Sequence, residues 1–223
     1  MKNLFIDTST ENSLVVFAEN ESPLFIGDIP KGIGNSKLVA PEIEKGLAFL
    51  GITPQDLSYI SVGIGPGSYT GIRVGMSLAQ ALAYATKTHL ITICSLDGYN
   101  PSENGEFIAI VNANAGGAYY KTGLKKEGIV LWTSEVRVAQ LHEINEFLHI
   151  SKAVSPDATS LQTKAQNIPA LQHVKWQNCT PDINSILYQL HEKFQKQDFS
   201  KGYTDNILYL KKTNAEINKK SGS

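Results

Sequence analysis

The sequence contains few of the residues that mark disulfide-stabilised or membrane-spanning proteins. Only two of its 223 residues are cysteines, Cys94 and Cys179, and they lie far apart. Two widely separated cysteines indicate free thiols in a reducing compartment, so we expect a cytoplasmic protein. No apolar run reaches the ~20 residues of a membrane helix, and we expect no membrane association. The opening residues reach Asp7 at once and do not resemble a signal peptide.

Charge of one sign is also scarce in this chain. The 20 lysines and arginines are balanced by 21 acidic residues, which gives a formal net charge of −1. Basic residues never stand more than two in a row. Proteins that bind nucleic acids as their main task usually carry a basic patch, so the composition does not favour that role.

The patterns of common catalytic sites are missing as well. No two of the five histidines lie four residues apart, the spacing of a helical metal-binding pair. Ser68 has Pro66 and Thr70 where a nucleophile elbow requires glycines. The glycines at 65, 67 and 71 match neither a dinucleotide fingerprint nor a P-loop, which needs Gly-Lys-Ser/Thr. We therefore expect no catalytic residue and no metal site.

The most informative stretch that is present runs from Ser58 to Thr86 and reads as strand, turn and helix. Apolar residues alternate with small ones up to Ile64, which is the two-residue period of a strand. Gly65-Pro66-Gly67 then breaks the strand. The hydroxyl of Ser68 or Thr70 can cap the helix that follows.

This helix has an unusually wide apolar surface. At about 100° per residue, Arg73, Ser77, Gln80 and Tyr84 form one narrow polar stripe. The rest of the wheel is apolar or small, roughly twice the ~100° of an ordinary surface helix. One flank is rich in valine and leucine, and we expect it to pack on the chain's own sheet. The other flank is rich in glycine and alanine and permits close approach by either another helix of this chain or a partner protein. Its members, with the two large residues beside them, are Gly71, Ile72, Gly75, Met76, Ala79 and Ala83.

Patterns along the rest of the chain predict two similar halves. In the first half, three short strands up to Ile29 are followed by a helix over 36–50, and then by the strand, helix and further strand (89–95) around the stretch described above. In the second half, strands at 107–111, 118–124 and 129–133 precede a helix predicted over 138–149. Strands near 153 and 175 and an amphipathic helix over 183–194 follow.

A three-strand meander followed by helix, strand and helix, occurring twice, is the outline of a duplicated ribonuclease-H-like fold. It matches the α/β architecture of actin-like and sugar-kinase-like (ASKHA) ATPases, with two βββαβα-type lobes. We predict an N-terminal lobe over 1–104 and a C-terminal lobe over 105–220. Residues 221–223 read as an added tail that belongs to neither lobe.

A nucleotide-binding reading is the alternative that the residues leave open. Asp7, Thr8, Ser9 and Thr10 could surround a phosphate at the end of the first strand, and Gly65 and Gly67 could supply a second loop. The chain would then be an ATPase-like enzyme. The other interpretation is a polar turn and a helix cap, in which case both loops are degenerate and no cofactor is expected.

Three segments resemble the TsaB (YeaZ) family. The longest is GIGPGSYTGIRVGMSLAQALA, which is similar to the family's hallmark segment, and the resemblance covers about the first half of the chain. NLFIDTSTENSLVVFAEN is similar to the opening strand pair, and the residues from Asn35 to Pro41 are similar to a helix start. The chain departs from the family at Asn35, which replaces a histidine, and at Asn112, Asn114 and Gly117, which replace Asp, Arg and Glu.

The resemblance implies a non-catalytic subunit in the synthesis of threonylcarbamoyladenosine in tRNA. Such a subunit pairs with a catalytic paralogue, TsaD, whose helix equivalent to 36–50 carries a metal-binding histidine pair that this chain lacks. An ATPase of the TsaE family joins the assembly. ATP and metal are then expected on the partner subunits, tRNA is contacted only indirectly, and the isolated chain forms a homodimer.

The resemblance also implies where the partner docks. Family members pair through helices of the N-terminal lobe, so we assign the glycine-alanine flank at 71–83 to that contact. A third reading, a protease, rests only on an older family label and has neither a histidine pair nor a nucleophile elbow to support it.

Overall fold

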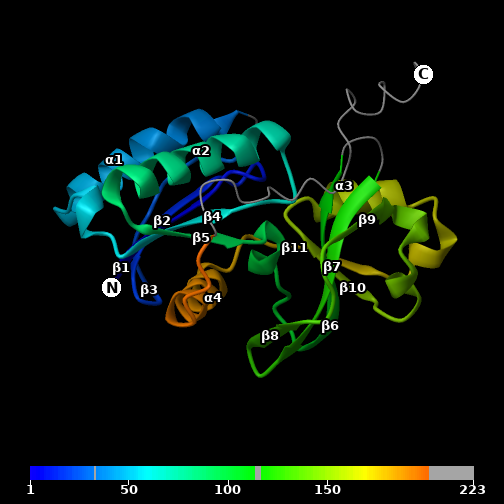
Figure 1. Ribbon diagram of the computed structural model, residues 1–223. Coiled ribbons are helices and arrows are strands. Elements are labelled where there is room, and N and C mark those ends of the chain that lie inside the picture. Colours follow the sequence, from blue (N-terminus) through cyan, green and yellow to red (C-terminus); the bar gives the residue numbers. More distant parts are fainter. Residues whose placement is uncertain (33, 114–116, 201–223) are drawn as a thin grey trace, which may run out of the picture.

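The computed structural model describes residues 1–32, 34–113 and 117–200, and forms two mixed sheets joined by two short segments, 94–104 and 179–182 (Figure 1). The first sheet has the strand order β3-β2-β1-β4-β5. Its strands are β1 (Lys2–Asp7), β2 (Leu14–Glu19), β3 (Ser22–Ile26), β4 (Tyr59–Gly63) and β5 (His89–Ile93). The meander β1-β2-β3 is antiparallel, whereas β4 and β5 add in parallel beside β1.

The second sheet repeats this arrangement with the order β11-β10-β6-β7-β8. Its strands are β6 (Gly105–Asn112), β7 (Gly117–Lys126), β8 (Ile129–Trp132), β9 (Arg137–Gln140), β10 (Lys152–Ser155) and β11 (Lys175–Asn178). The pairs β6–β7 and β7–β8 are antiparallel, and β10 and β11 are parallel additions. The repeated strand order confirms the predicted duplicated ribonuclease-H-like, ASKHA-type α/β fold.

Helices cover both faces of the first sheet. One face carries α1 (Val39–Leu50), preceded by the 3-10 turn η1 (Asn35–Leu38), and α2 (Tyr69–Thr86). The opposite face carries α4 (Ile183–Gln195), which Figure 1 shows below the sheet. The core under α1 and α2 is built on residues such as Ile6, Val62 and Met76. The core under α4 joins Phe5 and Tyr59 to Leu187 and Leu190.

The return of α4 bears on the predicted division of the chain. The predicted boundary between the lobes at residue 104 stays a prediction. The segment 183–195 nevertheless packs on the first sheet, although the sequence assigned it to the C-terminal lobe. We therefore call β1–β5 with α1, α2 and α4 the first lobe, and β6–β11 with α3 (Ala158–Ala165) the second lobe. Residues 201–223, with the predicted tail 221–223, lie outside the described residues.

The predicted helix over 138–149 is wrong. The chain instead forms β9, which pairs with β7, and then two 3-10 turns, η4 (Leu141–Glu143) and η5 (Asn145–Leu148). The buried residues are Leu141, Ile144, Phe147 and Ile150. Their spacing of three fits the ~3.0 residues per turn of a 3-10 helix rather than the ~3.6 of an α-helix. The structure also contains α3, which the sequence patterns did not predict. Further 3-10 turns are η2 (Pro54–Asp56), η3 (Ser95–Gly98) and η6 (Pro169–Leu171).

No helix in the described part of the chain combines the length and apolar character that crossing a membrane requires.

Candidate functional site

Two polar loops meet at one edge of the first sheet. The loop after β1 begins at Asp7, and the loop between β4 and α2 contains Gly65 and Gly67. Because β1 and β4 are adjacent and parallel, their carboxyl ends lie side by side. The structure therefore brings together the residues that the sequence proposed as a phosphate cradle.

Thr8 joins these loops by direct hydrogen bonds. Its hydroxyl donates to the carbonyl oxygen of Gly71 over 2.5 Å and accepts from the backbone N–H of Gly75 over 3.1 Å. Neither glycine can be replaced by alanine in this geometry. A Cβ at Gly71 would overlap the Thr8 carbonyl oxygen, and a Cβ at Gly75 would overlap the Thr8 hydroxyl. The glycines of α2 are thus explained by close approach of the chain's own first strand.

The other polar groups of the two loops are also engaged with each other. The Ser9 carbonyl accepts from the backbone N–H of Ser68 over 2.6 Å, and a Cβ at Gly67 would overlap that same carbonyl. Thr10 pairs with Tyr99, with 3.2 Å between the two hydroxyl oxygens. The Ser68 hydroxyl accepts from Gly71 N–H, which confirms the predicted helix cap. The hydroxyls of Thr8 and Thr10 and the backbone N–H of Ser68, which could otherwise hold a phosphate, are thus bonded within the chain.

Asp7 is buried beside these loops. Its carboxylate accepts from the backbone N–H of Ser9 over 2.7 Å, and it fills the space above Gly63, where any Cβ would overlap it. Burial raises the pKa of Asp7, and hydrogen bonds from Ser9 and Ser95 offset part of that rise. Nothing in the described parts of the chain gathers three or more His, Cys, Asp or Glu side chains that could hold a metal ion. The Asp7 carboxyl is therefore packed against Gly63 and bonded to the loop that follows β1.

Positions 112 and 117, where the chain departs from the TsaB pattern, have structural roles in the second lobe. Asn112 ends β6 and its side-chain oxygen accepts from the Lys164 ammonium over 2.7 Å. Gly117 begins β7 and its carbonyl accepts from Ala113 N–H. Asn114 and the side chain of Asn35 lie outside the part of the chain that the structure describes.

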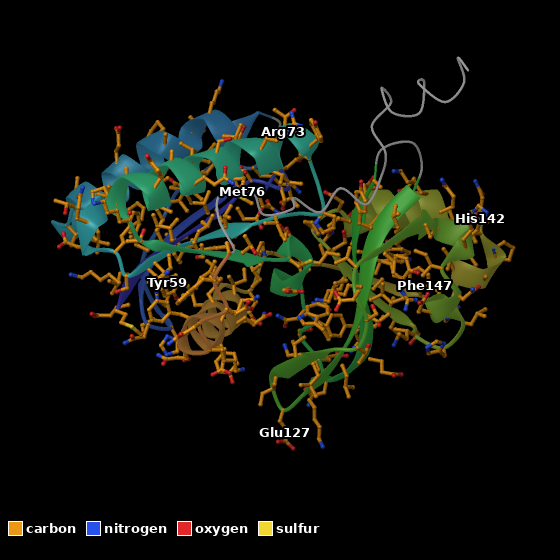
Figure 2. All side chains as sticks on the ribbon, in the orientation of Figure 1. Tyr59, Arg73, Met76, Glu127, His142 and Phe147 are labelled. Atoms are coloured by element: carbon orange, nitrogen blue, oxygen red, sulfur yellow. The ribbon has the colours of Figure 1, made fainter. Side chains whose placement is uncertain are left out.

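The residues predicted to contact a partner face inward. The buried residues of α2 are Gly71, Ile72, Gly75, Met76, Ala79 and Ala83. Figure 2 shows Met76 pointing toward the sheet and Arg73 on the opposite side of the helix. The prediction that this flank lies open to a partner is therefore wrong, because β1 and β4 of the same chain already cover it. The small residues let α2 lie so close to the sheet that Thr8 reaches its backbone.

The exposed side of α2 carries a shallow depression of about 540 Å³. It is lined by Tyr69, Thr70, Arg73, Val74, Ser77 and Leu78. The Arg73 guanidinium carbon lies 4.0 Å from the centre of the Tyr69 ring, an arrangement typical of a cation–π contact. Tyr84, further along the helix, is 71% exposed. The polar stripe of Arg73 and Ser77 was visible on the helical wheel and would have identified this as the open side.

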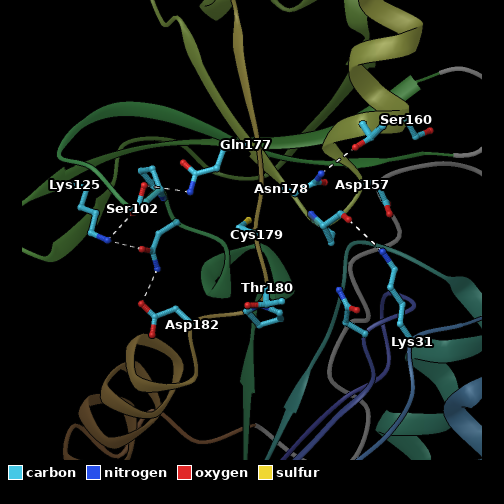
Figure 3. Close-up of a pocket in the computed structure, with 16 residues that line it drawn as sticks. Lys31, Ser102, Lys125, Asp157, Ser160, Gln177, Asn178, Cys179, Thr180 and Asp182 are labelled. Atoms are coloured by element: carbon cyan, nitrogen blue, oxygen red, sulfur yellow. Dashed lines mark hydrogen bonds between the residues drawn. The ribbon is translucent and has the colours of Figure 1, made fainter.

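A second hollow lies between the two lobes and has a volume of about 850 Å³ (Figure 3). Its walls are a mixture of polar and apolar surface from both lobes, with Lys31 on one side and Lys125 on the other. Both ammonium groups donate to oxygens of the chain itself: Lys31 to the Pro156 carbonyl over 3.4 Å, and Lys125 to the Pro101 carbonyl over 2.6 Å. The sequence patterns did not single out these residues, because they come from six separate segments of the chain.

Comparison with known proteins links this geometry to one family. The profile described as TsaD, tRNA N6-adenosine threonylcarbamoyltransferase, matches residues 34–131. The protein named tRNA threonylcarbamoyladenosine biosynthesis protein TsaB from Buchnera aphidicola is 29% identical over 148 residues, which cover 64% of this chain and 69% of that one. The protein of the same name from Bacillus subtilis is 31% identical over 57% of this chain and 59% of its own length. The protein of the same name from Haemophilus influenzae is 33% identical over 42% of this chain and 39% of its own length.

Solved structures show the same fold over nearly the whole chain. A Pseudomonas aeruginosa protein described as similar to peptidase YeaZ superposes with a TM-score of 0.75 at 17% identity, covering 94% of this chain and 99% of that one. YeaZ from the same organism superposes with a TM-score of 0.70 at 16% identity, covering 90% of this chain and 96% of that one. This chain is therefore similar in sequence to proteins named TsaB and similar in fold to YeaZ.

Proposed function

We propose that this chain is a non-catalytic subunit of the machinery that makes threonylcarbamoyladenosine in tRNA. The relatives bear the name of that biosynthesis, which supports a role in the same process. The observation that carries the non-catalytic role is the mutual engagement of the two loops. The hydroxyls of Thr8 and Ser68 bond to the backbone of α2, and the backbone N–H of Ser68 donates to the Ser9 carbonyl, so these loops are poorly suited to cradle a phosphate.

The proposed partner is a catalytic paralogue of the TsaD family, and the proposed docking surface is the exposed face of α2. That face combines the depression at Val74 and Leu78 with the exposed rings of Tyr69 and Tyr84. Aromatic and arginine side chains around an apolar centre are typical of protein interfaces. The same face would serve self-association when the chain is alone. An ATPase of the TsaE family would complete the assembly, with ATP and metal held by the partner subunits.

The test is co-purification with the TsaD-family protein of the same organism, combined with an assay of threonylcarbamoyl transfer to tRNA. Val74→Glu places a charge in the centre of the depression, so we expect loss of pairing and of transfer activity. Leu148→Glu is the matched control, because Leu148 is 74% exposed on the second lobe. It should leave both unchanged, and both variants should melt like the wild type.

Two results would count against the proposal in different ways. If Val74→Glu pairs as tightly as the wild type, the docking surface is wrong while the role stands. If the wild-type chain neither pairs with a TsaD-family protein nor supports transfer, the role itself is wrong. Tight binding of ATP by the isolated chain in calorimetry would favour the nucleotide-binding alternative instead.

A further inference from the structure

The longer of the two segments that join the lobes, residues 94–104, makes many contacts for a connection between two sheets. It runs from the end of β5 to the start of β6 and includes the turn η3. All four residues of η3 are buried. Leu96 and Tyr99 pack with Phe107 and Val154 in the core of the second lobe. Hinges are normally loop residues with few contacts, free to change their backbone angles.

The second lobe grips this segment with two lysines from one strand. The Lys121 ammonium lies 2.5 Å from the Asp97 carboxylate, and both side chains are nearly buried. Four residues further along β7, Lys125 donates to the Asn100 side chain over 2.8 Å. Lys121 also lies 4.5 Å from the centre of the Trp132 ring. An ion pair with so little exposure is only weakly screened by salt.

The first lobe grips the same segment from the other side. The backbone N–H of Ser95 donates to the Gly65 carbonyl over 2.8 Å, and Gln189 of α4 donates to the Asp97 carbonyl over 3.3 Å. Asp182, the cap of α4, accepts from the Asn100 side chain over 3.1 Å. Because Lys125 of the second lobe also donates to the Asn100 side chain, Asn100 is held by both lobes at once. Figure 3 shows Lys125 and Asp182 on either side of these bonds.

We propose that this joint is rigid, that the Asp97–Lys121 ion pair is its main lock, and that the cleft between the lobes therefore keeps one width in solution. Domains joined by a small polar interface are expected to move relative to each other. Here residues 95–101 of the connection are buried, and Asp97 and Asn100 are bonded to both lobes. These contacts would have to break together before the lobes could rotate. A partner would meet a single preformed surface rather than one that closes around a ligand.

Distance measurement between two spin labels tests the proposal. Ala81→Cys on α2 and Leu148→Cys on the second lobe place one label on an exposed position of each lobe. Burial raises the pKa of Cys94 and of Cys179 to about 12, so these native thiols react slowly. Diluted with an excess of unlabelled chain, so that only distances within one chain are measured, the full chain should give one narrow distance distribution, unchanged when magnesium ATP is added.

The lock itself is tested by the double variant Asp97→Asn/Lys121→Met. Removing both charges leaves no unpaired buried ion, so this variant should fold. We expect a broadened and shifted distribution in it. Lys45→Met, which breaks an exposed ion pair with Glu42 inside α1, is the matched control and should leave the distribution narrow. A broad distribution in the wild type, or a narrow and unshifted one in the folded double variant, would overturn the proposal.

Discussion

A single threonine decides how the first strand and the second helix meet. The Thr8 hydroxyl both donates to and accepts from the backbone of α2, and the two glycines that it contacts have no room for a Cβ. The helix wheel correctly identified Gly71 and Gly75 as sites of close approach. It could not tell what approaches, because the sequence pattern of a helix packed on its own strand and of one packed on a partner is the same.

Gly71→Ala should destabilise the protein although alanine favours helices. The new Cβ meets the Thr8 carbonyl, and a backbone atom cannot rotate away. Overpacking of this kind costs about 1–3 kcal/mol, against the ~1 kcal/mol that alanine gains over glycine in a helix. Urea unfolding should show a net loss of stability. Ser77→Ala, on the exposed side of α2, should be neutral or mildly stabilising. A Gly71→Ala protein more stable than the wild type would contradict this account.

Asp7→Asn should become relatively more stabilising as the pH rises. Burial raises the folded-state pKa of Asp7 above its ordinary 3.8, so the folded protein holds this proton more tightly than the unfolded chain does. Ionisation of Asp7 therefore costs stability as the pH climbs from about 4 through the folded pKa. The asparagine lacks this cost and can still accept from Ser9 N–H.

Thermal melts of the wild type and of Asp7→Asn at a series of pH values measure the effect. The melting temperature of the variant relative to the wild type should increase from low to neutral pH. The opposite trend would mean that the ionised carboxylate stabilises the fold, as a metal ligand or a partner of a buried cation would.

At the scale of elements, the spacing of buried residues separates correct from incorrect predictions. The 3.6-residue pattern of α2 and of α4 produced helices with nearly the predicted ends. The pattern at 138–149 predicted a helix because Leu141, Ile144 and Leu148 would lie on one face of an α-helix. In the structure Phe147 is buried and Leu148 is 74% exposed. A segment with apolar residues at both 147 and 148 fits either period, and only the pairing of β9 with β7 decides between them.

Phe147→Ala and Leu148→Ala distinguish the two conformations. Phe147 lies in the core of the second lobe and its ring packs near Trp176, with 5.8 Å between ring centres. Its loss should cost about 3–5 kcal/mol. Leu148→Ala should change stability by less than about 0.5 kcal/mol, as is usual for exposed sites. Chemical denaturation of both variants provides the comparison, and equal losses would support an α-helix here.

At the scale of the whole molecule, the sequence predicts the fold but not the lobe on which the last helix, α4, packs. Strand order and duplication follow from local patterns, because each strand and turn has its own signal. The position of α4 depends on which sheet face is left uncovered. The sequence indicates an amphipathic helix over 183–194 without indicating the surface that it covers. The loops of the inter-lobe hollow were missed for the same reason, since their residues meet only after both lobes have formed.

Leu190→Ala should weaken the first lobe rather than the second. Leu190 is fully buried among residues of β1, β4 and β5. The substitution should cost about 2–5 kcal/mol, and hydrogen exchange should accelerate in β1 and β4 more than in β6 and β10. Leu171→Ala removes a buried leucine from the core of the second lobe and should give the reverse pattern. Faster exchange in β6 alone after Leu190→Ala would place α4 with the second lobe.

The seating of α4 on the first sheet also sets an order of events during synthesis. The strands that α4 covers end at Ile93, but the ribosome must read on past Gln195 before that cover exists. At a synthesis rate of about 5–20 residues per second, the apolar face of the newly made sheet stays uncovered for on the order of ten seconds. During that interval the exposed apolar face can be bound by chaperones. A chain truncated before α4 would leave this face permanently exposed.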